Sequence, residues 1–219
     1  MSSNVIAVIV GHVGETSATI TLKISRVQPK MTLEYLNFNV AIRERELNLE
    51  QIASVSINNL QMLLEALEMP LAVGPIKDED FLLLASRFAE LEWDYGFSKF
   101  GNRDDKFEFC LKLLEGQQKH IPCGAALCTF DEQTGVLDIH FVECFVRDDP
   151  GHPLTGNMFL VTLFAVYFFG FAAKCTEIRI PEPLNQDVVD YYKEYGFDGD
   201  LELLSAPFAT IVSTVKSYI

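Results

Sequence analysis

Basic side chains are scarce in this chain. Its 219 residues hold 17 lysines and arginines against 31 aspartates and glutamates, which gives a formal net charge of −14. Nucleic-acid binding needs a phosphate-neutralising surface and anionic membranes attract basic segments, so this balance argues against both partners. The surplus favours either solubility alone or a cationic partner such as an amine, a polyamine or a basic peptide. Residues 1–69 carry 5 basic and 7 acidic side chains and residues 70–219 carry 12 and 24, so the second part holds most of the excess.

Long hydrophobic runs and a basic N-terminal region are also missing. The longest apolar stretch, Met158 to Ala173, would span about 24 Å as a helix against roughly 30 Å of hydrocarbon, which predicts a deeply buried helix. Met1 to Asn4 lacks the basic start of a signal peptide. An odd number of cysteines in apolar surroundings favours reduced, mostly buried thiols: Cys110, Cys123, Cys128, Cys144 and Cys175. We therefore expect a cytoplasmic protein.

Several chemical motifs are absent. A zinc site would have to be assembled from scattered residues, namely Cys123, Cys128, His120 and His140. No C-x-x-C pair supports such a site, so we expect no metal. The sequence also contains no nucleophile elbow, Walker loop, dinucleotide fingerprint, internal repeat or low-complexity tract.

What is present is a globular composition, with 49% hydrophobic and 11% aromatic residues. Residues 1–69 predict a small strand-rich N-terminal module of unknown role. Its strands are expected over 5–10, 16–27 and 33–42, followed by a helix over 49–67. A module of this size is weakly stable alone, so we expect it to pack on the domain formed by residues 70–219.

Residues 70–219 predict an α/β (α+β) fold. The expected elements are a strand over 71–76, helices over 78–91 and 106–117, strands over 124–130 and 136–146, a helix over 157–173, a strand over 177–180, a helix over 186–195, and strands over 201–204 and 210–215. A strand, a crossover helix and a second strand imply a parallel pair, so the sheet is mixed, partly parallel and flanked by helices. The loop after the first strand of that pair is where such sheets bind ligands.

One segment carries a family resemblance. Residues Asn185 to Phe197 read NQDVVDYYKEYGF and resemble the N-x-x-A-x-x-x-Y-x-x-x-G-F segment of the GNAT-type N-acetyltransferase superfamily, with Val188 where alanine is usual. Val73 to Phe81 is similar to that family's first strand and the start of its first helix, and Gly124 to Leu127 to its third strand. The resemblance covers about residues 70–219. It implies a GNAT-like fold and an acyl-CoA-dependent N-acyltransferase that moves an acetyl group from acetyl-CoA to an amine by direct transfer.

The same segment has a plain structural interpretation. Asn185 can cap a helix, Gly196 can end it in a left-handed conformation, and Phe197 can pack back. The resemblance implies further that Asn185 and Tyr192 lie near coenzyme A and that the Tyr192 hydroxyl protonates the departing thiolate. A phenol suits that task because its pKa of about 10 is similar to the basicity of the sulfur anion.

The loop from Arg147 to Asn157 departs from the family pattern Q/R-x-x-G-x-G/A, whose backbone N–H groups hold pyrophosphate. The resemblance places the cofactor-binding residues in and beside this loop: Val146, Arg147, Gly151, Gly156 and Asn157. Pro153 removes one donor, and Asp148 and Asp149 would repel phosphate if they faced it. The alternative is therefore a catalytically degenerate GNAT-fold binding or assembly protein, with residues 1–69 making the contact.

The strand over 136–146 offers two candidate bases, His140 and Glu143. Strand alternation predicts that they lie on opposite faces of the sheet. The resemblance implies that the Val146 amide polarises the thioester carbonyl, and His140, which shares the parity of Val146, ranks first. The plain alternatives are a satisfied core histidine and a surface glutamate.

Acidic and aromatic residues gather in the segment that, by resemblance, borders the acceptor groove. They are Glu90, Glu92, Trp93, Asp94, Tyr95, Phe97, Phe100, Asp104 and Asp105. The acids either attract an amine or form a solvated helix face, and the aromatics either line the groove or close the core. The expected partner is an amine-bearing small molecule or peptide, with no nucleic acid and no membrane, and a homodimer is left open.

Overall fold

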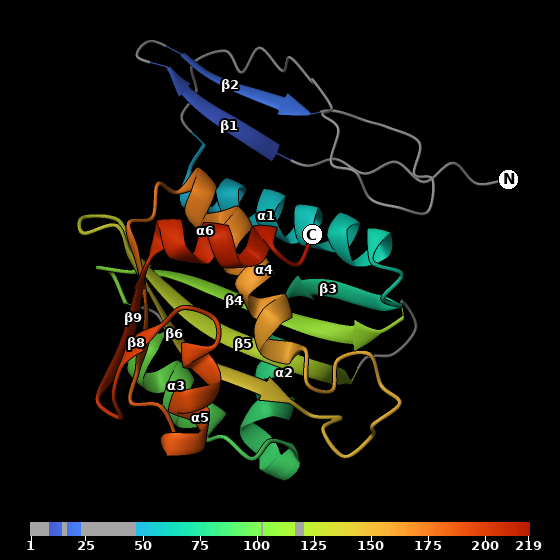
Figure 1. Cartoon of the computed structure of the whole chain (residues 1–219). Helices are drawn as coiled ribbons and strands as arrows, with labels where there is room; N and C mark the ends of the chain where they lie inside the picture. Colours follow the sequence, from blue (N-terminus) through green and yellow to red (C-terminus); the bar gives the residue numbers. More distant parts are fainter. Residues whose placement is uncertain (1–8, 15–16, 23–46, 102, 117–120) are drawn as a thin grey trace, which may run out of the picture.

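The computed structural model of the chain describes residues 9–14, 17–22, 47–101, 103–116 and 121–219 (Figure 1). Strands β1 (Ile9–Gly14) and β2 (Ser17–Leu22) pair antiparallel as a two-stranded sheet of their own. Two of the strands expected in residues 1–69 are thus confirmed, the first of them reaching Gly14 instead of ending at residue 10. The strand predicted over 33–42 lies outside the described residues.

The main sheet has seven strands in the order β3-β4-β5-β6-β7-β9-β8. They are β3 (Leu71–Pro75), β4 (Phe107–Glu115), β5 (Pro122–Asp131), β6 (Val136–Cys144), β7 (Glu177–Pro181), β8 (Asp198–Gly199) and β9 (Leu203–Pro207). Neighbouring strands are antiparallel except β6 and β7, which are parallel and joined by helix α4 (Met158–Ala172). The predicted mixed, partly parallel sheet flanked by helices is therefore confirmed.

Helices cover both faces of this sheet (Figure 1). The remaining ones are α1 (Leu49–Ala66), α2 (Asp78–Leu83), the π-helical turn η1 (Leu84–Phe88), α3 (Trp93–Phe100), α5 (Gln186–Lys193) and α6 (Phe208–Lys216). Helices α1, α4 and α6 bury the larger hydrophobic core against one face. On the other face, Leu84, Trp93 and Phe97 pack on Ala125 and Leu127 of β5. The two faces are called here the α4 side and the α3 side.

Helix α4 is apolar all round because it is enclosed. It contacts α1, α6 and β6, and Leu163 and Phe169 have no exposed surface. Helix α1 begins at a capping box between Asn48 and Gln51 and packs on β3 and α4. Within the described residues, no helix combines the length and apolarity that a membrane crossing requires. None of the five cysteines, all in the described part of the chain, forms a disulfide.

The helix predicted over 106–117 is wrong, because this segment forms strand β4. Its leucine, lysine and glutamate residues have good helix propensity. Pairing with β3 on one side and β5 on the other nevertheless makes the segment a strand. Phe109, Leu111 and Leu113 alternate into the α4-side core. The intervening Lys112 is buried against Asp80, with its Nζ 2.5 Å from Asp80 Oδ2.

The strand predicted over 210–215 is also wrong, because this segment belongs to helix α6. Its β-branched residues favour a strand, yet Ile211 and Val215 are four residues apart and both are fully buried, which is helical spacing. The helix predicted over 78–91 ends at η1, and the second helix of this region is α3.

Candidate functional site

Strands β6 and β7 pair over only three residues each. The pairs join Val136–Asp138 to Glu177–Arg179, after which β6 continues beside β5 and β7 beside β9. The two strands therefore part toward their carboxyl ends. This is the position at which the predicted crossover places a ligand.

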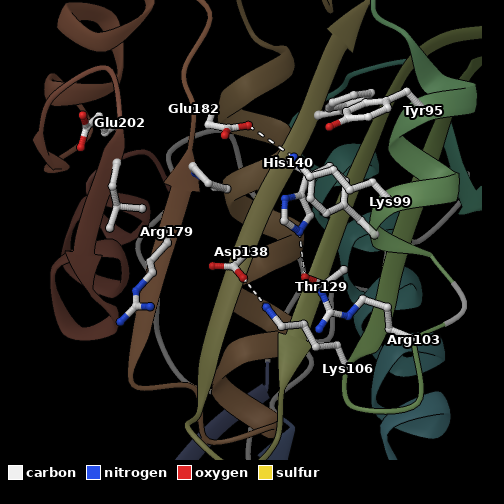
Figure 2. Close-up of a pocket in the computed structure, with 14 residues that line it drawn as sticks. Tyr95, Lys99, Arg103, Lys106, Thr129, Asp138, His140, Arg179, Glu182 and Glu202 are labelled. Atoms are coloured by element: carbon white, nitrogen blue, oxygen red, sulfur yellow. Dashed lines mark hydrogen bonds and ion pairs between the residues drawn. The ribbon is translucent and has the colours of Figure 1, made fainter.

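A pocket of about 410 Å³ opens on the α3 side where the strands part (Figure 2). This volume suits a small molecule. Its lining residues come from α3, the loop after α3, and strands β5, β6, β7 and β9 with their flanking loops: Tyr95, Lys99, Phe100, Arg103, Lys106, Thr129, Asp138, His140, Phe141, Arg179, Pro181, Glu182, Glu202 and Leu203.

Three cations surround Asp138 at one end of the pocket, which we call the basic end. The Lys106 Nζ donates to Asp138 Oδ2 at 2.7 Å. Arg103 and Arg179 interact electrostatically with the same carboxylate. Two further carboxylates hold the arginines: Asp105 on Arg103 and Glu177 on Arg179.

Two acidic residues lie together at the other end, which we call the acidic end. Glu182 follows β7, and its backbone N–H donates to the Glu202 carbonyl at 3.0 Å. The Glu182 carboxylate is 3.6 Å from Lys99 Nζ, and both side chains are exposed. In the described part of the chain the Glu202 carboxylate has no hydrogen-bond or ion-pair partner. It is therefore available to a cation.

His140 lies in the pocket wall on β6. Its ring stacks on Phe100 with centroids 3.7 Å apart, and its Nε2 is 2.8 Å from Thr129 Oγ1. Its Nδ1 is buried and has no partner among the described residues. Burial lowers the pKa of His140 to about 4, so the imidazole is neutral at pH 7. A base with so low a pKa takes a proton from an ammonium poorly.

A bulge in β6 changes which residues share a face. The register of β6 against β5 shifts at His140, which stands opposite no residue of β5. His140 and Glu143 consequently both face the α3 side, since Glu143 accepts a hydrogen bond from Trp93. Val146 packs in the α4-side core instead. The prediction that His140 and Glu143 lie on opposite faces of the sheet is therefore wrong. The expectation that His140 lies on the face of Val146, drawn from their shared parity, is wrong too, because the bulge interrupts the alternation of β6.

Glu143 is a buried carboxylate with several donors. It accepts hydrogen bonds from the Glu90 N–H at 2.7 Å and the Leu91 N–H at 3.3 Å. It also accepts from Trp93 Nε1 at 2.7 Å and from Arg147 Nη2 at 3.2 Å. These contacts tie β6 to the segment between η1 and α3. They leave Glu143 better suited to holding this segment than to receiving a substrate proton.

Tyr192 lies on α5 beside the N-terminal end of α4. Its ring contacts that of Phe159, with centroids 4.1 Å apart. Burial raises the pKa of Tyr192 to about 12, and its hydroxyl makes no hydrogen bond to any described residue. Asn185 caps α5 by accepting from the Val188 N–H at 3.0 Å. Tyr192 therefore keeps its proton at pH 7 and has it free to donate.

The loop between β6 and α4 uses many of its own backbone donors. The N–H groups that donate within it are those of Asp149, Gly151, His152, Leu154, Thr155 and Asn157. Gly151 donates to the Asp149 carboxylate at 2.9 Å, so an internal anion already occupies this amide. Arg147 is also engaged, since its guanidinium pairs with Glu90 and Glu143.

The donors that follow the loop are different. The N–H groups of Gly156, Met158, Phe159 and Leu160 have no acceptor within the described residues. Gly156 has a φ of +76°, and no atom lies within 4 Å of the place where a Cβ would stand. The Asn157 side chain donates to the Pro153 carbonyl at 2.9 Å instead of capping the helix. The N-terminus of α4, a 15-residue helix, thus fits phosphate oxygens, whereas Gly151 and Arg147 are engaged elsewhere.

Several residues that line the pocket are not predicted from the sequence. They are Lys99, Arg103, Lys106, Asp138, Arg179, Glu182 and Glu202. A usable signal was present, because Asp138 and Arg179 are charged residues between buried apolar neighbours of short strands. Of the aromatic candidates, Trp93 and Phe97 close the α3-side core, whereas Tyr95 and Phe100 line the pocket.

Comparison with known proteins finds similarity to solved structures. No family model matches the chain, and no curated protein matches it. Solved structures that resemble it include an uncharacterized protein from Bacillus halodurans, with a TM-score of 0.49 and 11% identity over 68% of this chain and 89% of that one. Mutant forms of the spermidine/spermine N-acetyltransferase SpeG from Vibrio cholerae give 0.47 and 11% over 66% and 97%. The ribosomal-protein-S18-alanine N-acetyltransferase from Escherichia coli gives 0.46 and 9% over 63% and 94%.

Structural similarity at such low sequence identity identifies neither a substrate nor any residue of the site. The fold rests on the chain's own features. These are the strand order, the parallel pair β6 and β7 with its crossover helix α4, and the helix α5 built from the Asn185 segment. Together they agree with the GNAT-like mixed, partly parallel sheet that the resemblance of the Asn185 segment implies.

Proposed function

We propose that the protein is an acyl-CoA-dependent N-acyltransferase that moves an acetyl group from acetyl-CoA to an amine by direct transfer. The observation that supports the proposal is that β6 and β7 part between the pocket on one side and the N-terminus of α4 on the other. On the α3 side lies the polar pocket, and beyond the end of β6 lies the first turn of α4, whose N–H donors have no acceptor within the described residues and on whose Phe159 the Tyr192 ring packs. An acyl donor and an amine acceptor can thus approach one point from different directions.

Acetyl-CoA supplies the activated thioester when bound. The N–H groups of Gly156 and of the first turn of α4 would hold its pyrophosphate, since they are free donors at the positive end of a helix dipole. Asn185, at the start of α5, and the Val146 amide are further proposed contacts. Gly151, Arg147 and the remaining loop donors would have to give up internal partners first.

The acidic end of the pocket receives the amine. Among the described residues Glu202 pairs with no cation and Glu182 pairs with Lys99 alone, at 3.6 Å, so both carboxylates can attract an ammonium. The carboxylates orient the ammonium, which loses its proton to solvent before the amine attacks the carbonyl carbon. His140 shapes the pocket wall through Phe100 and Thr129 and, with its low pKa, contributes little as a proton acceptor.

Tyr192 protonates the leaving thiolate. Its hydroxyl is protonated throughout the physiological range, and burial raises its pKa to about 12, which makes it a weaker acid than an ordinary phenol. The neighbouring Tyr191 is engaged differently, since its hydroxyl lies 3.1 Å from the Tyr195 hydroxyl and 3.4 Å from the Gly156 carbonyl. Of these two hydroxyls, that of Tyr192 is therefore the one without a hydrogen-bond partner among the described residues.

One observation favours a second candidate, a GNAT-fold binding or assembly protein without catalysis. The loop from Asp149 to Asn157 satisfies most of its own donors and places the Asp149 carboxylate on the Gly151 amide. A loop filled in this way is also what a lost phosphate site would look like.

Thermal unfolding with and without acetyl-CoA separates the two candidates. At about a hundredfold excess over Kd, binding to the folded chain adds roughly 2.7 kcal/mol of stability and raises Tm. Free-thiol release in the presence of an amine panel then reports transfer. A Tm that stays constant at saturating acetyl-CoA contradicts the enzyme and favours the binding protein.

A further inference from the structure

The acceptor pocket is electrically two-ended. Its basic end gathers Arg103, Lys106 and Arg179 around the carboxylate of Asp138, and Asp105 and Glu177 pair with the two arginines from outside the pocket lining. Its acidic end holds Glu182 and Glu202, with Lys99 as the only cation of the lining at that end. Figure 2 shows the two groups separated along the pocket, with His140 in the wall between them.

The direction of β6 and β7 indicates which end of the pocket lies nearer the acyl group. Asp138 and Arg179 form the last pair joining β6 to β7, so they lie where the strands are still together. Glu182 follows the carboxyl end of β7, where the strands have parted. An acyl donor that reaches the pocket through this parting arrives at the acidic end. The basic end lies farther along the pocket, away from the reacting atoms.

The basic end has donors to spare. The Arg179 Nε is buried and has no hydrogen-bond partner in the described part of the chain. Lys106 donates to one oxygen of Asp138, which also neutralises part of the charge of two arginines. Asp105 and Glu177 bind the arginines from outside the lining and leave further N–H groups unused. Such a cluster offers N–H donors to an anion, whereas the second ammonium of a polyamine would find three cations there and an Asp138 carboxylate already bonded to Lys106.

We propose that the acceptor is a primary amine that carries an anionic group, a carboxylate or a phosphate, at its far end. This rests on the proposed N-acyltransferase function. The amine lies between Glu182 and Glu202, and the anionic group lies among Arg103, Lys106 and Arg179. A zwitterionic acceptor of this kind uses both ends of the pocket, whereas a polyamine leaves the basic end without a partner.

The test compares matched acceptors in acetyl transfer. We expect γ-aminobutyrate and ε-aminohexanoate to exceed butylamine and hexylamine at least tenfold in kcat/KM, and O-phosphoethanolamine against ethanolamine tests phosphate as the anionic group. Arg103→Gln should raise KM for the favoured anionic amine about tenfold with little change in kcat, because it removes a charge-assisted contact. Lys216→Gln, which removes the same charge from an exposed position of α6, should leave KM unchanged. Spermidine or the plain amines performing equally well overturns the proposal.

A binding readout separates this proposal from the proposed function. Saturation-transfer NMR of γ-aminobutyrate and butylamine on the full chain without acetyl-CoA requires no catalysis. Selective binding of γ-aminobutyrate that Arg103→Gln weakens supports the two-ended pocket even if no transfer occurs, in which case only the N-acyltransferase function fails. Equal binding of the two compounds overturns the two-ended pocket even where acetyl-CoA binds and is consumed.

Discussion

Asp138 and Arg179 face each other as the last pair joining β6 to β7, and both line the pocket that opens beyond them. The place where the sheet parts is therefore also a place of fixed charge. Because strand pairing holds their backbones, the positions of these two charges do not depend on a flexible loop. The tests below follow from this arrangement and from the buried polar contacts around it.

Tyr192→Phe should lower kcat about tenfold to a hundredfold with little effect on KM, because it removes the proposed proton donor and keeps the ring that packs on Phe159. Tyr191→Phe is the matched control and should keep kcat within about twofold, since its hydroxyl serves Tyr195 and Gly156. Steady-state thiol release measures both. Undiminished turnover in Tyr192→Phe removes the acid assignment.

His140 should make stability depend on pH. Its folded pKa of about 4 lies below its ordinary value of 6.5, so the unfolded chain binds the proton more readily between these values. Stability is then fully present above pH 6.5 and declines as pH falls toward 4, by about 2 kcal/mol between pH 7 and pH 5. Urea unfolding at both pH values should show this loss, and His140→Gln should reduce it by that amount. An identical pH dependence in the two proteins contradicts the assignment.

Glu143→Gln should destabilise the chain by about 2–3 kcal/mol, because an amide NH₂ would then face N–H donors. Trp93 is the one tryptophan of the sequence and donates directly to Glu143, so its fluorescence reports this change. We expect a red-shifted emission and a lower urea midpoint. Glu182→Gln, at an exposed position, should alter neither reading. Unchanged emission and midpoint in Glu143→Gln would argue against its holding role.

Asp80→Asn should cost about 3 kcal/mol, because it leaves the buried Lys112 ammonium without its carboxylate. The double variant Asp80→Asn with Lys112→Met removes both charges and should lose less than the sum of the two single variants. Chemical unfolding of the three variants gives the coupling. Additive losses would show that the pair contributes no coupling energy.

The sequence predicts most of the sheet and much of the site's location. The crossover from β6 through α4 to β7 follows from the apolar run and the two strands around it. Strand β4 does not, because its leucine, lysine and glutamate residues also favour a helix, and the burial of Lys112 depends on Asp80, a residue 32 positions away. Helix α6 is not predicted because the β-branched residues of 210–215 favour a strand, whereas the four-residue spacing of Ile211 and Val215 is that of a helix with one buried face.

The candidate site shows the same division. Tyr192, Asn185 and the loop before α4 follow from a sequence motif, whereas the bulge at His140 and the four donors around Glu143 arise from contacts between distant segments. Strand parity alone could not place His140 and Glu143 on one face. The basic end of the pocket draws residues from α3's following loop and from β6 and β7, and no local pattern unites them.

The proposed transfer requires acetyl-CoA to bind at the N-terminus of α4, and isothermal titration with acetyl-CoA measures that binding. Asn157→Asp adds a negative charge at this N-cap with little change in shape, and Asn48→Asp makes the same change at the N-cap of α1. We predict saturable binding that Asn157→Asp weakens at least tenfold and Asn48→Asp leaves unchanged, because like charges at the phosphate site repel. No binding by the unaltered chain, or equal affinity in all three proteins, would contradict the claim.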